Sequence, residues 1–189
     1  MDKTVVKKRG RIPVKKLVYT GMLAAIVAVL SQISFPLPSG VPVTLQTFAV
    51  AFSGYFGGAW GIVALLIYLA LGAVGVPIFA SFKGGFSVFV GPTGGFLVGF
   101  IPFVITCAIK IKVKNGVLNA VLRILIGCVG LAICHLFGAW WFGYQSGNGF
   151  AKSLLTASVP YIAKDVLSVV GAYFFTELLK KRTKLSLDN

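Results

Sequence analysis

Residues 17–82 contain no aspartate, glutamate, lysine or arginine, and this uncharged run constrains the fold more than any other feature of the sequence. A membrane-spanning helix needs about 20 apolar residues, so the run has room for three spans. A second uncharged run at 84–109 holds a loop and one span, 124–151 holds another, and 159–179 holds the last. We therefore predict an all-α integral membrane protein with six transmembrane helices.

The composition agrees with a single compact membrane domain. Of 189 residues 57% are hydrophobic, which is more apolar surface than the core of a globule of this length needs. The expected division is a basic tail at 1–16, a six-helix membrane domain at 17–182 and a short tail at 183–189. The first apolar segment has no small-residue cleavage site and runs on towards further spans, so we interpret it as helix one rather than a secretory signal.

The basic residues predict the orientation of this domain. The formal net charge is +14, and all but three of the 18 lysines and arginines precede the first span, separate spans four and five, or follow span six. The positive-inside rule makes that side the cytoplasm and places both termini there. Nucleic-acid binding is the alternative for so basic a chain, but no base-stacking pattern accompanies the charges. The remaining cations, Lys83, Lys152 and Lys164, fall on the outer side.

The sequence offers no convincing catalytic group. The four carboxylates are Asp2, Asp165, Glu177 and Asp188, and they do not form an evident pair, metal cluster or base beside a nucleophile. The glycine-rich stretch at 91–95 lacks the Gly-Lys-Ser/Thr of a Walker loop. We predict that the protein is not an enzyme, and that any ATP is hydrolysed by a partner.

Histidine and cysteine receive structural interpretations at this stage. Cys107, Cys128 and Cys134 lie inside predicted spans without metal-ligand spacing, and small buried side chains explain them. His135 interrupts the fifth span, and we interpret it as a hydrogen-bonded packing residue, with a functional role as the alternative. No metal and no cofactor are expected.

Asp165 is the strongest candidate for a functional residue. If the last helix begins near Ser158, Asp165 lies about 7 to 9 Å inside it, at 1.5 Å per residue. A carboxylate at that depth is costly unless it faces a cavity or a partner. The alternatives are a ligand-facing carboxylate and a salt bridge to Lys83 or Lys152. Lys164 is not expected to neutralise it, because adjacent helical residues point about 100° apart.

The stretch KGGFSVFVGPTGGF at 83–96 is predicted to be a lid on the outer side. Gly84 and Gly85 permit close backbone approach, and Lys83 adds a positive charge. Near Thr93 the fourth span begins, and its free N–H groups would point to the same mouth. A plain glycine-rich connector is the alternative.

Four motifs in order are similar to those of one family. They are VPVTLQT at 41–47, GVPIF at 75–79, GPTGGF at 91–96 and PYIAKD at 160–165. They resemble the BioY family, the biotin-binding S components of energy-coupling factor (ECF) vitamin transporters. The similarity covers about 17–179, and the departures are Ala-Ser-Phe at 80–82 and Ala-Lys at 163–164. The resemblance implies an S-component fold that captures extracellular biotin with high affinity.

The resemblance also implies how biotin would bind. Asp165 would accept the N–H groups of the ureido ring, and Phe79 and Phe86 would cover the apolar body. Lys83, or N–H groups next to Thr93, would bind the carboxylate.

Neutral polar side chains are expected to complete the site. Thr44, Gln46 and Thr47 would supply hydrogen bonds from the start of helix two, although Thr44 is equally suited to capping that helix. Tyr161 is expected at the rim, and Lys164 belongs to the same cluster.

Delivery of biotin inward would require partners. The family resemblance implies a transmembrane T component and two ATP-binding cassette ATPases. Ala24 and Ala28 on helix one have the four-residue spacing of a close helix contact with the T component. The expected location is the cell membrane, with multiple spans, in a bacterium. The alternative function is a secondary transporter of a small organic anion or another vitamin; a membrane enzyme would need the catalytic group that the sequence does not show.

Overall fold

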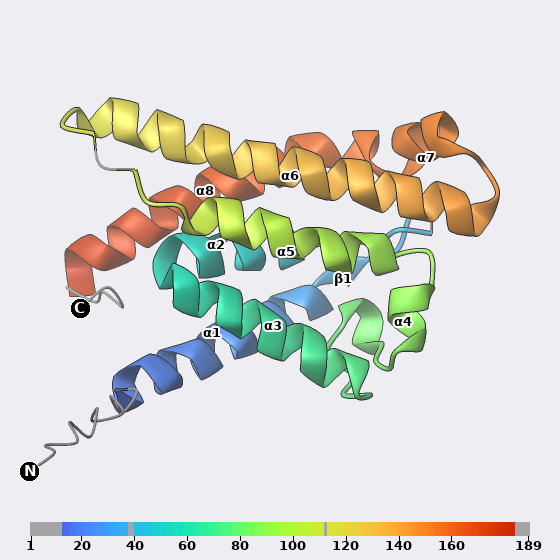
Figure 1. The fold of residues 1–189 in the computed structure, drawn as a ribbon, viewed down its shortest axis with the longest axis horizontal. Helices are drawn as coiled ribbons and strands as arrows, with labels where there is room; N and C mark the ends of the chain where they lie inside the picture. Colours follow the sequence, from blue (N-terminus) through green and yellow to red (C-terminus); the bar gives the residue numbers. More distant parts are fainter. Residues whose placement is uncertain (1–12, 38–39, 112, 184–189) are drawn as a thin grey trace, which may run out of the picture.

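The computed structural model describes residues 13–37, 40–111 and 113–183, and this part of the chain is mostly helical (Figure 1). Two-residue strands β1 (Ser34–Phe35) and β2 (Val43–Thr44) pair antiparallel. Short helices are η1 (Ala80–Phe82), α4 (Ser87–Val90) and α7 (Phe150–Ala157). The longer helices are α1 (Val14–Gln32), α2 (Gln46–Gly57), α3 (Ala59–Ala73), α5 (Gly94–Ala108), α6 (Gly116–Ser146) and α8 (Val159–Thr183).

These six longer helices occupy the predicted spans, but their lengths differ from the expectation. By length and composition, α1 and α6 are apolar enough to cross a membrane on their own. The helices α2, α3 and α5 have 12, 15 and 15 residues, fewer than the about 20 of a full span. Between α2 and α3 the chain reverses at Gly58, whose φ of 55° lies in the left-handed region that favours glycine.

Several predicted boundaries were wrong. Helix α6 begins at Gly116 rather than near residue 124, because the side chain of Asn115 accepts hydrogen bonds from the N–H groups of Val117 and Leu118. Helix α7 was not predicted. Helix α1 already starts at Val14, inside the expected tail at 1–16, and most of the two tails lies outside the described residues.

The centre of the bundle is α2. All its residues except Phe48 are buried, and it packs against α1, α3, α5 and α8. Beside it, α5 runs along α6 (Figure 1). Glycines bring these two helices close together: a Cβ on Gly99 would lie 2.9 Å from the sulfur of Cys134, and one on Gly138 would lie 2.3 Å from the ring of Phe96. This close approach positions the α5 and α6 side chains of the pocket described below.

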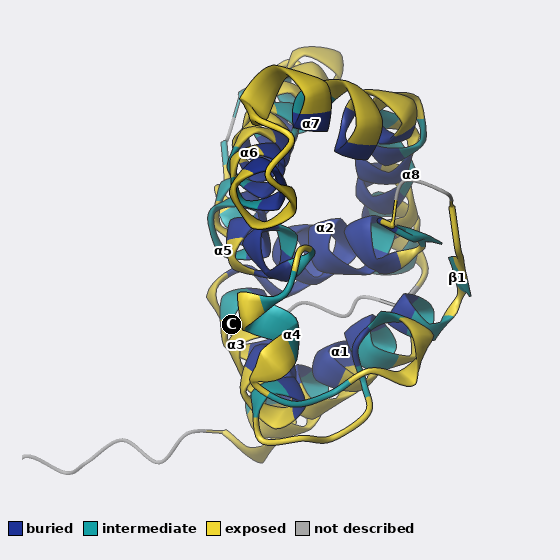
Figure 2. Cartoon of the chain, turned by 90° about the vertical axis from the view of Figure 1, so that its right-hand side faces the viewer, coloured by how far each residue is buried: buried dark blue, intermediate teal, exposed yellow. Residues whose placement is uncertain are grey.

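The two ends of the bundle differ in character. The start of α1, the end of α8 and the connection into α6 lie at one end (Figure 1), and this end carries most of the described basic residues. The opposite end carries β1, α4 and α7, and Figure 2 views the molecule from that side, with the buried residues facing inward. The folded chain therefore gathers at one end the cations that the sequence spreads over three segments.

Arg123 departs from its predicted place in a basic loop. It lies within α6 and is 7% exposed. Its guanidinium sits 5.4 Å from the ring centre of Tyr55 and 5.3 Å from that of Tyr173, and 3.5 Å from the carboxylate of Glu177. Cation–π contacts and the ion pair therefore tie α6 to α2 and α8 at the basic end.

Helix packing at Gly61 gives a stability prediction. A Cβ there would lie 1.9 Å from the carbonyl oxygen of Ser53, so Gly61→Ala should force α2 and α3 apart and destabilise the protein by about 1 to 3 kcal/mol. Gly21, within α1, has open space where a Cβ would lie, with no neighbouring atom within 4 Å, and Gly21→Ala should be neutral or stabilising by up to about 1 kcal/mol. Thermal unfolding in detergent measures both, and equal melting temperatures for the two variants would contradict this packing.

Candidate functional site

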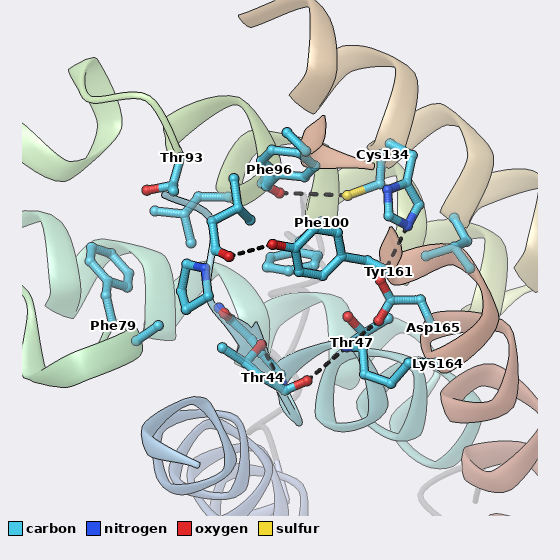
Figure 3. Close-up of a pocket in the computed structure, with 18 of the residues that line it drawn as sticks. Thr44, Thr47, Phe79, Thr93, Phe96, Phe100, Cys134, Tyr161, Lys164 and Asp165 are labelled. Carbon is cyan, nitrogen blue, oxygen red and sulfur yellow. Dashed lines mark hydrogen bonds and ion pairs between the residues drawn. The ribbon is translucent and has the colours of Figure 1, made fainter. Parts of the chain in front are cut away.

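A pocket lies at the end of the bundle that carries β2, α4 and α7, and α2, α5, α6 and α8 form its walls (Figure 3). Its lining mixes an apolar surface with a few polar side chains, as small-molecule sites do. The apolar residues are Val41, Pro42, Phe79, Ala80, Val88, Phe96, Leu97, Phe100, Leu131 and Ala157. The other lining residues are Thr44, Gln46, Thr47, Lys83, Thr93, Cys134, His135, Tyr161, Lys164 and Asp165.

Asp165 is the buried charge of this pocket, at 5% exposed. Its Oδ1 pairs with the ammonium of Lys164, and its Oδ2 lies 3.2 Å from Nε2 of His135. The expectation that Lys164 would not pair with Asp165 was wrong. Helical geometry separates the directions of the two Cβ atoms, but the four methylenes of lysine are flexible enough to bring the ammonium back to the carboxylate. The ion pair with Lys164 and the contact with His135 take the place of the expected salt bridge to Lys83 or Lys152.

Lys164 also connects this charge to the start of α2. Its Nζ donates a hydrogen bond to the carbonyl oxygen of Thr44 at 2.8 Å. Thr44 lines the pocket, and its Oγ1 accepts the N–H of Gln46 at 3.3 Å at the beginning of the helix. The side chain of Thr47, also buried, adjoins the Asp165 carboxylate (Figure 3).

Hydrogen bonds from their side chains hold Gln46 and Tyr161 in place. Gln46 donates from Nε2 to the hydroxyl of Tyr68 at 2.9 Å, which fixes its amide within the pocket wall. Tyr161 is 4% exposed, and its hydroxyl donates to the carbonyl oxygen of Val41. It is therefore a buried wall residue that ties α8 to the segment before β2, and the prediction of a rim position was wrong.

His135, which the sequence suggests is a packing residue, lines the pocket beside Asp165. Its backbone carbonyl accepts a hydrogen bond from Oγ of Ser158 at 3.2 Å, which joins α6 to the start of α8. Ser158, near which the last helix was expected to begin, is therefore bonded to another helix. The signal in the sequence for this position in the pocket was an ionisable side chain inside an otherwise uncharged span.

The predicted lid at 83–96 and the residues 78–82 before it form one segment, which hydrogen bonds tie to two helices. Residues 78–82 are fixed to α1: Ser31 and Gln32 donate to the carbonyl oxygen of Ile78 at 2.6 and 2.8 Å, and Phe82 N–H donates to Oε1 of Gln32 at 2.9 Å. At the other end, Trp141 and Gln145 of α6 donate to the backbone before α5, at the carbonyls of residues 91 and 90. Side chains of two helices therefore hold both ends of the segment.

Within this segment the predicted residues divide into two groups. Phe79 is 1% exposed and lines the pocket with Lys83, to which its backbone is hydrogen-bonded in both directions. Phe86 is 69% exposed and lies outside the lining. Gly84 and Gly85 lie outside the lining too. The N–H of Gly85 donates instead to the carbonyl oxygen of Gly72 in α3, at 2.7 Å.

Thr93 lines the pocket immediately before α5, as expected. The first turn of this helix is less open to a ligand than the sequence suggested. Gly94 N–H donates to the carbonyl oxygen of Gly91, and Phe96 N–H donates to that of Thr93. Two of the N–H groups that were predicted to bind an anion are therefore already hydrogen-bonded to backbone carbonyls.

The two alanines predicted to contact a partner lie partly inside the bundle. Ala24 is 7% exposed and belongs to the core, whereas Ala28 is half-buried. The small residues that α1 exposes are Gly21 and Ala25. The face of α1 that could contact another helix closely is therefore the one that carries Gly21 and Ala25.

Comparison with known proteins identifies the family. The family model described as BioY family matches residues 2–185. This chain belongs to the BioY family. The biotin transporter BioY of Thermotoga maritima is 34% identical over 168 residues, with 88% of this chain and 96% of that protein covered. The probable biotin transporter BioY of Pyrococcus horikoshii is 32% identical over 170 residues, covering 89% and 98% of the two chains.

A solved structure shows the same fold as this BioY family member. It is the crystal structure of the S-component for biotin from an ECF-type ABC transporter, with a TM-score of 0.79. The two sequences are 23% identical, and the match covers 89% of this chain and 92% of the other. The family resemblance carried by the four sequence motifs is confirmed, and with it the S-component fold.

Proposed function

We propose that this chain is the membrane-embedded biotin-binding S component of an ECF-type transporter, which captures extracellular biotin and delivers it inward. The observation that carries the proposal is the pocket: nine of the twelve residues expected to bind biotin line it together, around the buried Asp165. The names of the relatives, biotin transporters in bacteria and archaea, support the same ligand.

The pocket suits the chemistry of biotin from one end to the other. Asp165 provides a carboxylate for the N–H groups of the ureido ring. The rings of Phe79, Phe96 and Phe100 provide apolar cover for the thiophane and the alkyl chain. Lys83, on the segment that closes the pocket near Phe79, provides a cation for the carboxylate of the side chain.

The orientation in the membrane follows from the two ends of the bundle. The basic end would face the cytoplasm with both termini, and the pocket would open to the outside. Helices α1, α2, α3, α5, α6 and α8 would then form the six spans of one domain over 17–182, with the shorter members crossing the apolar layer as part of the packed bundle.

Inward delivery is assigned to partners. A T component and two ATP-binding cassette ATPases would complete the transporter, with ATP hydrolysis in the ATPases and no cofactor in this chain. A secondary transporter is the alternative function, and it needs coupling to an ion gradient. Purified protein that binds biotin without ATP or an ion gradient would favour the S component.

The first prediction of the proposed function concerns Asp165. The variant Asp165→Asn should weaken biotin binding by about 1.5 to 3 kcal/mol, roughly 10-fold to 150-fold, because a charge-assisted hydrogen bond to the ureido ring is lost. Isothermal titration of the purified protein measures the dissociation constant. Val129→Ala, a change at an exposed position of α6 outside the pocket, is the control. Unchanged affinity in a folded Asp165→Asn variant would remove this residue from the site.

The second prediction concerns Lys83. If its ammonium binds the carboxylate of biotin, Lys83→Ala should weaken biotin more than it weakens the uncharged biotin amide. The difference should be about 1 kcal/mol or less and should shrink as salt is added, because Lys83 is exposed and its ion pair is screened. Competition binding at two salt concentrations measures it. Equal losses for the acid and the amide would show that Lys83 contributes packing alone.

The third prediction concerns docking to the T component. The double variant Gly21→Trp with Ala25→Trp should keep biotin binding and abolish uptake in cells that carry the ATP-driven module, because bulk prevents close helix approach. Leu167→Trp on α8, at a position that is 71% exposed, is the matched control and should transport normally. Normal uptake by the α1 variant would place the docking surface on another helix. Ala24→Trp is unsuitable for this test, since it would disrupt the core.

A further inference from the structure

His135 is a buried polar side chain without a hydrogen bond of good geometry. Its side chain is 10% exposed, and it lines the pocket. Within the described part of the chain neither ring nitrogen has a hydrogen-bond partner that meets both distance and angle, although Nε2 lies 3.2 Å from Oδ2 of Asp165. Buried polar groups in folded proteins are nearly always paired, so an unpaired imidazole in a pocket wall calls for a ligand.

The position of the ring is determined by its surroundings. Phe96 of α5 meets it edge to face, with ring centres 6.2 Å apart at 81°. The backbone carbonyl of His135 accepts a hydrogen bond from Ser158, and the carboxylate of Asp165 lies 3.2 Å from Nε2 of the imidazole. Packing from α5 and α8 therefore presents the ring to the pocket in a defined orientation.

The ion pair between Asp165 and Lys164 favours a neutral ring at His135. The carboxylate of Asp165 is already paired with the ammonium of Lys164, so a neutral imidazole avoids burying a second cation there. A neutral imidazole has one N–H donor and one lone-pair acceptor. With the proton on Nε2, which faces Asp165, Nδ1 is left as an acceptor.

We propose that His135 is a second ligand-binding residue, whose Nδ1 accepts one ureido N–H of biotin while Asp165 accepts the other. This inference rests on the proposed function and deepens it. A ring with two N–H donors requires two acceptors, and the described walls on α6 and α8 place the imidazole of His135, with Nδ1 unpartnered, next to the carboxylate of Asp165 in the pocket lining. The pair would discriminate against analogues that lack one N–H, because an unpaired buried acceptor is costly.

Two substitutions of His135 distinguish a role of Nδ1 in binding from a role of Nε2. Asparagine places a polar atom close to the position of Nδ1, whereas glutamine reaches the position of Nε2. We expect His135→Asn to keep biotin affinity within about threefold, and His135→Gln and His135→Leu each to lose about tenfold. Titration of purified protein with biotin gives the dissociation constants, and thermal unfolding checks that each variant is folded. Wild-type affinity in His135→Gln with loss in His135→Asn would overturn the proposal, since Nε2 alone would then matter.

A second measurement uses the wild-type protein and needs no variant to fold. Biotin methylated on one or the other ureido nitrogen loses a single N–H donor. We expect both isomers to bind at least about tenfold more weakly than biotin, because each N–H has its own acceptor. Wild-type affinity for either isomer would overturn the proposal and leave biotin as the ligand. Failure of the wild-type protein to bind biotin itself would instead refute the proposed function.

Discussion

The carboxylate of Asp165 can be buried in an apolar helix bundle only if it is partnered, and the pocket end of the structure is built on that requirement. An unpartnered charge at such a depth costs about 2.5 to 3.5 kcal/mol on insertion scales. The partners come from different elements: Lys164 from α8 itself and His135 from α6. Lys164 extends the connection to the carbonyl of Thr44, at the start of α2. One buried anion thus fixes three parts of the chain around a cavity.

The requirement that a buried charge be partnered also applies at the basic end of the bundle, where the charge is a cation. Arg123 is buried between the rings of Tyr55 and Tyr173 and pairs with the partly exposed Glu177. Aromatic faces fill the space around this cation, whereas a pocket lies beside Asp165. The bundle is therefore closed by packed charge at its basic end and hollow at the other, which is the asymmetry that a substrate-capturing subunit needs.

The segment between α3 and α5 contributes Phe79 and Lys83 to the pocket lining. Hydrogen bonds from Ser31 and Gln32 of α1, and from Trp141 of α6, hold it in place, while Phe79 fills space against Tyr68 and Phe89. Side chains from helices that are far apart in sequence therefore hold this segment in place.

The sequence by itself determined the membrane class, the order of the helices, the basic end and most of the pocket polar residues, because charge exclusion and local motifs act over short stretches of chain. It singled out Asp165, which is buried and lines the pocket, since an ionisable residue in an apolar run has few explanations. Only the tertiary structure decided which charges pair. Lys164 reaches back to Asp165, His135 faces the ligand cavity, Arg123 leaves its predicted loop, and Phe86 turns outward. These outcomes depend on side-chain rotamers and on the close approach of α5 to α6, which helical periodicity does not encode.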